Sequence, residues 1–164
     1  MQEHGDFTWT PRATLARAAQ DEYPWRHYLQ TAVEFHADGR AGTVWPLDAH
    51  LPGGDRPPLG SLHVITAIQP DTDPASADNA ARMTVLDHEL QAADIASLRA
   101  SGVSFDGKHR EESRAVFGLD DERARALGLR LGQVAIFSWR GRRWSLLACA
   151  TDRQDHRGWR WQAR

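Results

Sequence analysis

The chain has 164 residues, 41% of them hydrophobic and seven of them tryptophan, which is enough to build the core of one domain. No apolar run approaches the roughly 20 residues that cross a bilayer, and the N-terminus lacks the basic and apolar regions of a signal peptide, so we expect no membrane partner. The net charge is −2, and the single cysteine, Cys149, excludes an internal disulfide and favours a reducing cytoplasm.

The first element that the sequence predicts is a helix. Thr10 followed by Pro11 is typical of a helix start, because Thr can cap the helix and Pro is tolerated in its first turn. Pro24 is expected to end this helix, since proline in a helix interior removes a hydrogen bond and clashes with the preceding turn.

A β-hairpin should follow the helix. Residues 31–36 and 43–47 have the β-branched and aromatic character of short strands, and residues 38–40 between them resemble a hairpin turn. Pro46 has no backbone N–H to donate to a neighbouring strand, so we expect the second strand at an edge of the sheet.

The middle of the chain predicts a buried strand and then an amphipathic helix. Residues 62–68 are almost continuously apolar, which suits a central strand covered on both faces. After Ser76, a typical N-cap, hydrophobic residues recur every three or four positions as far as residue 93. This spacing predicts a helix whose apolar side packs on the sheet.

The last third of the chain predicts a strand, a helix and a final hairpin. A strand over residues 114–118 precedes Asp120, which should cap a helix over residues 120–131. Residues 134–139 and 144–149 flank a short loop, which predicts an antiparallel pair.

Together these elements predict an α+β fold. Because hairpins outnumber strand–helix–strand crossovers, we expect a two-layer sandwich of about three helices packed on a mixed, largely antiparallel sheet. The chain should form a single domain, with residues 1–60 as a candidate N-terminal cap, 61–149 as the core and 150–164 as a basic aromatic tail or strand.

Short groups of residues between positions 61 and 149 carry a resemblance to a known family. They are Ile65-Thr66-Ala67 followed by Pro70, Asp78-Asn79 at the start of the long helix, Glu111-Glu112-Ser113 before a strand, and Gly132-Gln133 before Val134-Ala135. In this order they resemble a bacterial family, domain of unknown function 3293. The resemblance implies a compact cytoplasmic bacterial domain and brings no known activity.

Polar residues fall at the ends of the expected strands and helices, where ligands often bind. They are Thr66, Gln69, Asn79, Glu111, Ser113 and Gln133. If these ends converge, the side chains line one pocket, in which the amides offer donors and acceptors and the carboxylate can take a proton. The alternative is that they hydrogen-bond to the local backbone as caps and turns.

His109 and Glu111 are the candidate catalytic residues. Alternate residues of a strand share a face, and histidine titrates near neutral pH, so the two could act as an acid–base pair near Ser113. The alternative is a cluster of charges on an exposed loop.

No metal site and no cofactor are expected. Asp71 and Asp73 have the spacing of the first two ligands of a calcium loop, but Ala75 and Arg82 stand at later ligand positions. The eight histidines have no zinc-binding spacing, and no glycine-rich nucleotide motif or serine-hydrolase motif occurs.

The C-terminal end is basic and aromatic. Residues 138–164 carry seven basic and two acidic side chains, which leaves 13 and 20 for the rest of the chain. The candidate nucleic-acid contacts are Arg140, Arg142, Arg143, Arg157, Trp159, Arg160 and Trp161. Such residues bind single-stranded nucleic acid by phosphate neutralisation and base stacking. The alternative is a C-terminal strand with both tryptophans inward and Arg160 outward.

Two functions from different classes remain open. The first is a non-catalytic binding module for single-stranded nucleic acid or a nucleotide, which the basic aromatic end favours. The second is a small enzyme in which Glu111 and His109 perform acid–base chemistry in a pocket at strand ends. We expect Glu111, Asn79 and Gln133 to border one pocket if the enzyme hypothesis holds.

Overall fold

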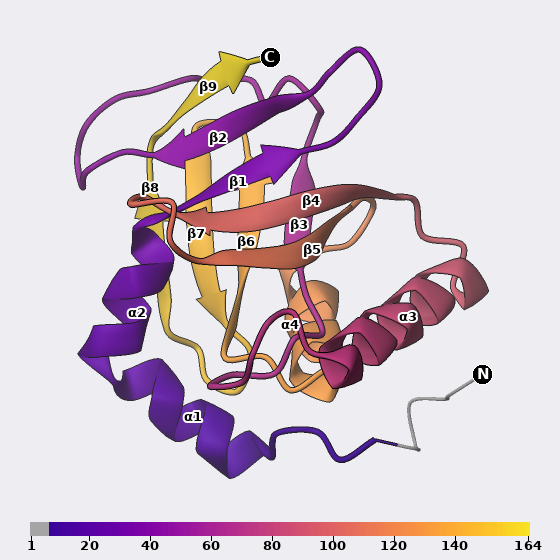
Figure 1. Ribbon diagram of the computed structural model, residues 1–164. Helices are drawn as coiled ribbons and strands as arrows, with labels where there is room; N and C mark the ends of the chain where they lie inside the picture. Colours follow the sequence, from indigo (N-terminus) through magenta and orange to yellow (C-terminus); the bar gives the residue numbers. More distant parts are fainter. Residues whose placement is uncertain (1–6) are drawn as a thin grey trace.

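The computed structural model describes residues 7–164, which form four helices and nine strands (Figure 1). The helices are α1 (Arg12–Gln20), α2 (Glu22–Leu29), α3 (Ala77–Ala92) and α4 (Asp121–Arg130). The strands are β1 (Thr31–Phe35), β2 (Gly42–Pro46), β3 (Leu62–Ile65), β4 (Ser97–Ser104), β5 (Arg110–Val116), β6 (Ala135–Arg140), β7 (Arg143–Ala148), β8 (Gln154–Arg157) and β9 (Trp159–Ala163). Within the described residues, no helix is both long and apolar enough to cross a membrane.

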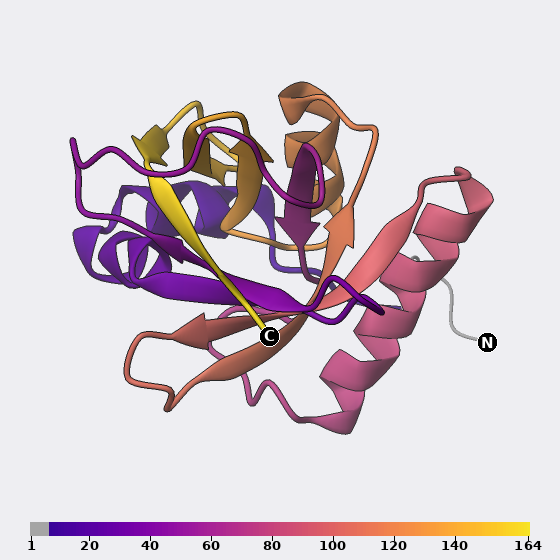
Figure 2. The same ribbon diagram turned by 90° about the horizontal axis from the view of Figure 1, so that it is seen from above.

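The nine strands form one antiparallel sheet in the order β8-β7-β6-β3-β5-β4-β1-β2-β9. The two edge strands, β8 and β9, are consecutive in the sequence and are separated only by Gly158. A Cβ atom at position 158 would lie 2.6 Å from the carbonyl oxygen of Leu51, so glycine is needed at this junction. The sheet therefore curls into a nearly closed barrel, in which β6 and β7 face β1 and β4 (Figures 1 and 2).

The predicted two-layer sandwich of about three helices on a mixed sheet is wrong. The structure has four helices, and all strand pairs of the described sheet are antiparallel. Two strands lack the apolar pattern on which the prediction depended: β4 contains three serines and one glycine, and β8 is short and polar. With these strands added, the sheet is wide enough to close, and its inner face packs on itself.

The N-terminal segment forms two helices where one was predicted. The helix α1 ends at Gln20, and the Asp21 side chain accepts a hydrogen bond from the Tyr23 backbone N–H (3.1 Å) to begin α2. Pro24 lies in the first turn of α2, where a backbone N–H has no partner within the helix. The prediction that Pro24 ends the first helix is therefore wrong.

The predicted hairpin of β1 and β2 is confirmed, with Val33 opposite Val44. The prediction that Pro46 marks an edge strand is wrong, because β2 also pairs with β9 and Pro46 lies opposite Trp159. Pro46 is the last residue of β2, so its missing N–H interrupts the ladder only at the end of the strand.

The helices α3 and α4 begin at the predicted caps. Ser76 Oγ accepts a hydrogen bond from the Asn79 backbone N–H (3.1 Å), and Asp120 Oδ1 accepts one from the Arg123 backbone N–H (2.8 Å). The predicted hairpin of β6 and β7 is also confirmed. These elements agree with the prediction because capping, spacing and turn residues all indicate the same structure.

The two faces of the barrel wall build different cores. On the outer face, Ile65, Ile136 and Leu147 pack beneath α3 and α4. The barrel core, on the inner face, consists of Val33, Phe35, Val44, Leu62, Val64, Ala100, Ala115, Trp139, Trp144 and Trp159. A third cluster joins α1 and α2 to Leu146 and Ala148 of β7. The N-terminal helices thus cover one end of the barrel.

Candidate functional site

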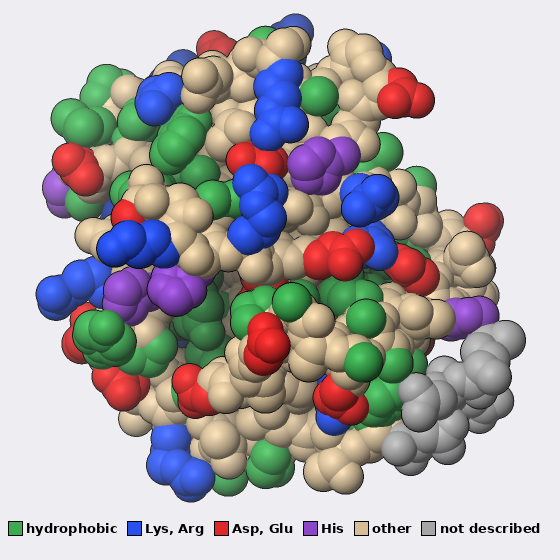
Figure 3. Space-filling view, in the orientation of Figure 1, with side chains coloured by type: hydrophobic (Ala, Val, Ile, Leu, Met, Phe, Trp, Pro, Cys, Tyr) green, Lys and Arg blue, Asp and Glu red, His purple; other side chains and the backbone are tan. Residues whose placement is uncertain are grey.

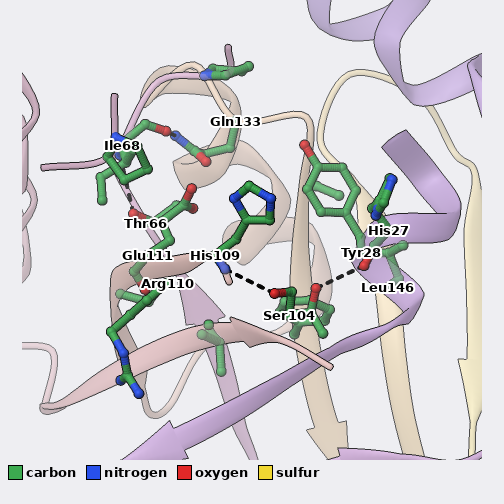
Figure 4. A pocket seen from close by; sticks show the side chains of 18 of the residues that line it. His27, Tyr28, Thr66, Ile68, Ser104, His109, Arg110, Glu111, Gln133 and Leu146 are labelled. Carbon is green, nitrogen blue, oxygen red and sulfur yellow. Dashed lines mark hydrogen bonds between the residues drawn. The ribbon is translucent and has the colours of Figure 1, made fainter. Parts of the chain in front are cut away.

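At the end of the barrel next to α2, a cavity of about 430 Å³ remains (Figure 4). Its apolar lining is Val64, Ile68, Pro70, Pro74, Ala135, Phe137 and Leu146. Its polar lining includes Thr31, Thr66, Ser104, His109, Arg110, Glu111, Ser113 and Gln133, and α2 contributes Tyr23, His27 and Tyr28. A concave, mostly apolar cavity with a few convergent polar groups is the usual form of a small-molecule site, and barrel mouths are a common place for one.

The alternation of side chains along the strands explains why these residues meet. In β5, Glu111, Ser113 and Ala115 share the inner face; Ala115 belongs to the barrel core, and the other two reach the cavity. In β6, Trp139 fills the core and Ala135 lines the cavity. The strands therefore carry apolar core residues at one end and small or polar residues at the other.

Glu111 dominates the electrostatics of the cavity. Among the described residues that line it, Glu111 is the only carboxylate. The side chain makes no hydrogen bond to another described residue, and burial raises its pKa to about 7. A carboxyl group with this pKa can accept and release a proton near neutral pH.

Three aromatic side chains of α2 close the cavity opposite the strands. Burial, and after it the charge of Glu111, raises the pKa of the Tyr28 phenol above its usual range, so Tyr28 stays protonated. Tyr23 and His27 lie at the exposed rim with their ring centroids 4.5 Å apart. In Figure 3, histidine and hydrophobic side chains lie side by side over α2.

Most of the other polar groups are oriented by bonds to the protein. Thr66 Oγ1 donates to the Glu112 carbonyl (2.7 Å), and Gln133 Nε2 donates to the Ile68 carbonyl (2.9 Å). Ser113 Oγ makes only a long contact, of 3.4 Å, with a carbonyl of its own strand. These bonds fix the shape of the cavity without a ligand.

The structure brings five of the predicted site residues together around the cavity. They are Thr66, His109, Glu111, Ser113 and Gln133. His109 precedes β5 at the exposed rim, and its backbone N–H donates to Ser104 Oγ (3.0 Å). Convergence of strand ends, which the sequence suggested, therefore occurs for these residues.

Gln69 and Asn79 do not line the cavity. Both are buried, and the Asn79 side chain accepts a hydrogen bond from the Gln69 backbone N–H (3.0 Å) and donates to Thr72 Oγ1 (2.8 Å). The Gln69 side chain donates to the Leu131 carbonyl (2.8 Å) and accepts from the Thr10 backbone N–H (3.0 Å). Asn79 follows the alternative of local hydrogen bonds, whereas Gln69 joins segments that are distant in the sequence. Because Asn79 does not line the cavity, the predicted pocket shared by Glu111, Gln133 and Asn79 is not found.

Several lining residues were missed by sequence reasoning. Tyr23 and Tyr28 lie on α2, which the sequence patterns did not separate from α1. Gly102 and Ser104 lie on β4, which the patterns did not identify. Asp21 three residues before Pro24 is a helix-start signal that could have found α2.

The C-terminal tryptophans lie in or against the barrel core. Trp159 is 4% exposed, and its Nε1 donates to the Gly141 carbonyl (2.8 Å). The half-buried Trp161 packs against Phe35. Their placement follows the alternative interpretation, in which a C-terminal strand turns both tryptophans inward.

The candidate arginines of the basic end are more exposed. Arg140, Arg142 and Arg143 are exposed in and next to the turn between β6 and β7. Arg160 is exposed and stacks over the Trp45 ring at 5.0 Å, as the outward-facing residue of β9. Arg157 is half-buried, and one guanidinium nitrogen lies 3.7 Å from Asp155.

Comparison with protein families gives a match over residues 65–136 to the family described as "Protein of unknown function (DUF3293)". This match confirms the resemblance that the short motifs indicated. The matched residues include Thr66, Glu111 and Gln133 of the cavity. No curated protein and no solved structure matches the chain. Within residues 7–164, no group of three His, Cys, Asp or Glu side chains could hold a metal ion.

Proposed function

We propose that the protein binds a small molecule in the cavity at the mouth of its barrel. The observation that carries the proposal is a cavity of about 430 Å³ with an apolar wall and one unpaired carboxylate, Glu111. Small-molecule sites have volumes of roughly 300–1,000 Å³ and the same mixture of apolar walls and few polar groups.

The chemistry of the cavity wall also supports the proposal. A carboxylate in a largely apolar setting without a partner is unfavourable. The same strands fill the opposite end of the barrel with tryptophan side chains, so the fold itself does not require the cavity. A ligand would supply a partner for Glu111.

The test fills the cavity by mutation. A Cβ atom at Gly102 would lie 3.5 Å from Thr31 Cγ2, which is an ordinary contact, so Gly102→Phe can place its ring in the cavity. A library of small molecules is screened against the wild type by thermal denaturation, since a ligand that binds the native state raises the melting temperature. We expect compounds that stabilise the wild type and fail to stabilise Gly102→Phe.

The matched control is Ser101→Phe, on the opposite face of the same strand, which should keep the response to every compound. Ala135→Leu narrows the cavity from β6 and serves as a second filling variant if Gly102→Phe does not fold. Compounds that stabilise the wild type and both filled variants equally would contradict the proposal.

A second candidate function is acid–base catalysis in the same cavity. The observation that favours it is the pKa of Glu111, which burial raises to about 7, together with His109 at the rim of the same cavity. For a bound compound with an exchangeable C–H bond, NMR should show exchange of that hydrogen for deuterium with the wild type and not with Glu111→Gln. Binding without exchange would leave the protein as a binding module.

A nucleic-acid partner has less support. Trp159 and Trp161 pack in or against the barrel core, so base stacking would require them to leave the protein interior. The exposed arginines near the β6–β7 turn could contact phosphates alone, and such binding would weaken steeply as salt is added.

A further inference from the structure

We propose that the ligand of the cavity is a small organic ammonium compound, with an apolar body held by the cavity wall and a protonated nitrogen that binds Glu111. The inference rests on the proposed function and names the chemical class of the ligand. It follows from the hydrogen-bond donors, acceptors and charges that face the cavity.

Three of the four serine and threonine hydroxyls that line the cavity donate their hydrogens to the protein. The bonds run from Thr31 to the His27 carbonyl (2.9 Å), from Thr66 to the Glu112 carbonyl (2.7 Å) and from Ser104 to the Asp106 carboxylate (2.6 Å). Gln133 Nε2 is likewise used, because it donates to the carbonyls of Ile68 (2.9 Å) and Leu131 (3.0 Å). The donors left for a ligand are Ser113, with its long contact of 3.4 Å, and the tyrosine and histidine side chains that line the cavity.

The acceptors, in contrast, remain available. The Glu111 carboxylate and Gln133 Oε1 make no hydrogen bond to another described residue, and both residues line the cavity (Figure 4). A carboxylate accepts only, and the amide oxygen has two lone pairs. The cavity therefore matches a ligand that donates hydrogen bonds, as an ammonium group does.

The charges lead to the same ligand class. Arg110, the only arginine among the lining residues, makes two bonds to Glu34 (2.8 and 3.1 Å). Arg114, on the same strand, is bound to Asp87 (2.8 Å). No guanidinium group of β5 is left to neutralise Glu111, so the carboxylate can take its cation from a ligand.

The walls can hold the rest of such a molecule. Phe137 and Tyr28 line the cavity with aromatic rings, to which cations are attracted, and Val64 and Leu146 line it with aliphatic surface. An anionic ligand, such as a nucleotide phosphate, would meet the Glu111 charge and no free guanidinium group of β5. The lining thus favours an amine over an acid.

The affinity should depend on pH. An ammonium ion binds the ionised form of Glu111, which becomes less populated in acid. The other titratable groups that face the cavity are His27 and His109 at the rim and the tyrosines of α2, while Arg110 is paired with Glu34.

The test uses three probes with one indole body: tryptamine, tryptophol and indole-3-propionate. Isothermal titration at pH 8 should show tryptamine binding about tenfold or more tighter than tryptophol, because a hydrogen bond to a charged group is stronger than a neutral one. The propionate should bind weakest. The affinity of tryptamine should fall between pH 8 and pH 5.5.

Two neighbouring glutamates provide matched variants. Glu111→Gln should weaken tryptamine by about tenfold or more and leave tryptophol nearly unchanged. Glu112→Gln alters the next residue, which faces outward and pairs with Arg114, and it should change neither affinity.

Tighter binding of the alcohol or the acid, an unchanged tryptamine affinity in Glu111→Gln, or no tryptamine binding at about 1 mM would overturn the ammonium class. The cavity proposal would survive each of these results, because it depends on the compounds that Gly102→Phe excludes. It fails only if the filled variants bind as the wild type does.

Discussion

The two ends of the barrel interior are built by the same strands and differ in what they enclose. At one end, the Trp139 ring centroid lies 5.0 Å from that of Trp159 and 5.6 Å from that of Phe35. At the other end, the same strand β6 presents Ala135, and β5 presents Glu111 to a cavity. The first end is a packed core, and the second is a candidate site.

This difference shows that two properties of the sequence act separately. The two-residue period of a strand determines which side chains face the interior. The size and polarity of those side chains then determine whether the interior is filled or open. The predictions below test whether stability is concentrated at the tryptophan end and whether the mouth can change without loss of the fold.

The largest effect is expected at the tryptophan end. Trp139→Ala should lower the free energy of unfolding by about 3–5 kcal/mol, because a fully buried aromatic side chain leaves a large cavity. The control is Trp45→Ala, a half-buried tryptophan on the outer face of β2, which should lose much less. Urea denaturation followed by circular dichroism measures both, and equal losses would contradict the comparison.

The next effect concerns the mouth and its pH dependence. The pKa of Glu111 is raised to about 7 in the folded protein, so between its ordinary value near 4.5 and 7 the native state holds a proton that the unfolded chain has released. The free energy of unfolding should therefore fall as the pH rises through this window, by on the order of 2 kcal/mol.

Glu111→Gln removes the titrating group and should flatten this part of the stability profile, so the variant should exceed the wild type in stability above pH 7. Glu112→Gln serves as the control and should keep the decline. Denaturation at several pH values measures the profiles. A wild-type stability that rises between pH 4.5 and 7 relative to Glu111→Gln would show that Glu111 has a partner in the protein.

Local structure could be predicted from the sequence where several signals agree. Ser76 and Asp120 cap the two helices that pack on the outer face of the sheet, and the apolar spacing that follows each cap is regular. The barrel could not be predicted, because closure depends on β4 and β8. Their serine, glycine and charged residues carry no apolar alternation, so what makes them strands is pairing with their neighbours in the sheet: β4 with β5 and β1, and β8 with β7.

The candidate site could be predicted in part. Thr66, Glu111 and Gln133 follow or precede buried segments, so their position near a common end of the sheet followed from the order of elements. Asn79 and Gln69 have the same sequence setting and bind the backbone of a loop instead. The sequence does not distinguish an amide that faces a cavity from one that caps a loop, because only the direction of the side chain differs.

The smallest changes in stability are expected when two glycines are replaced by alanine. One glycine packs against the outer face of the sheet, and the other lies at the open mouth of the barrel. In α4, a Cβ atom at Gly128 would lie 2.6 Å from Cys149 Sγ and 2.9 Å from Ile136 Cγ2, so Gly128→Ala should lower stability by about 1–3 kcal/mol through overpacking. In β4, a Cβ atom at Gly102 meets Thr31 at 3.5 Å, so Gly102→Ala should be neutral or stabilising by about 0.5 kcal/mol, since alanine restricts the unfolded chain. Urea denaturation measures both variants. A loss in Gly102→Ala as large as that in Gly128→Ala would mean that the mouth is packed as tightly as the helix interface, and the cavity would then have no room for a ligand.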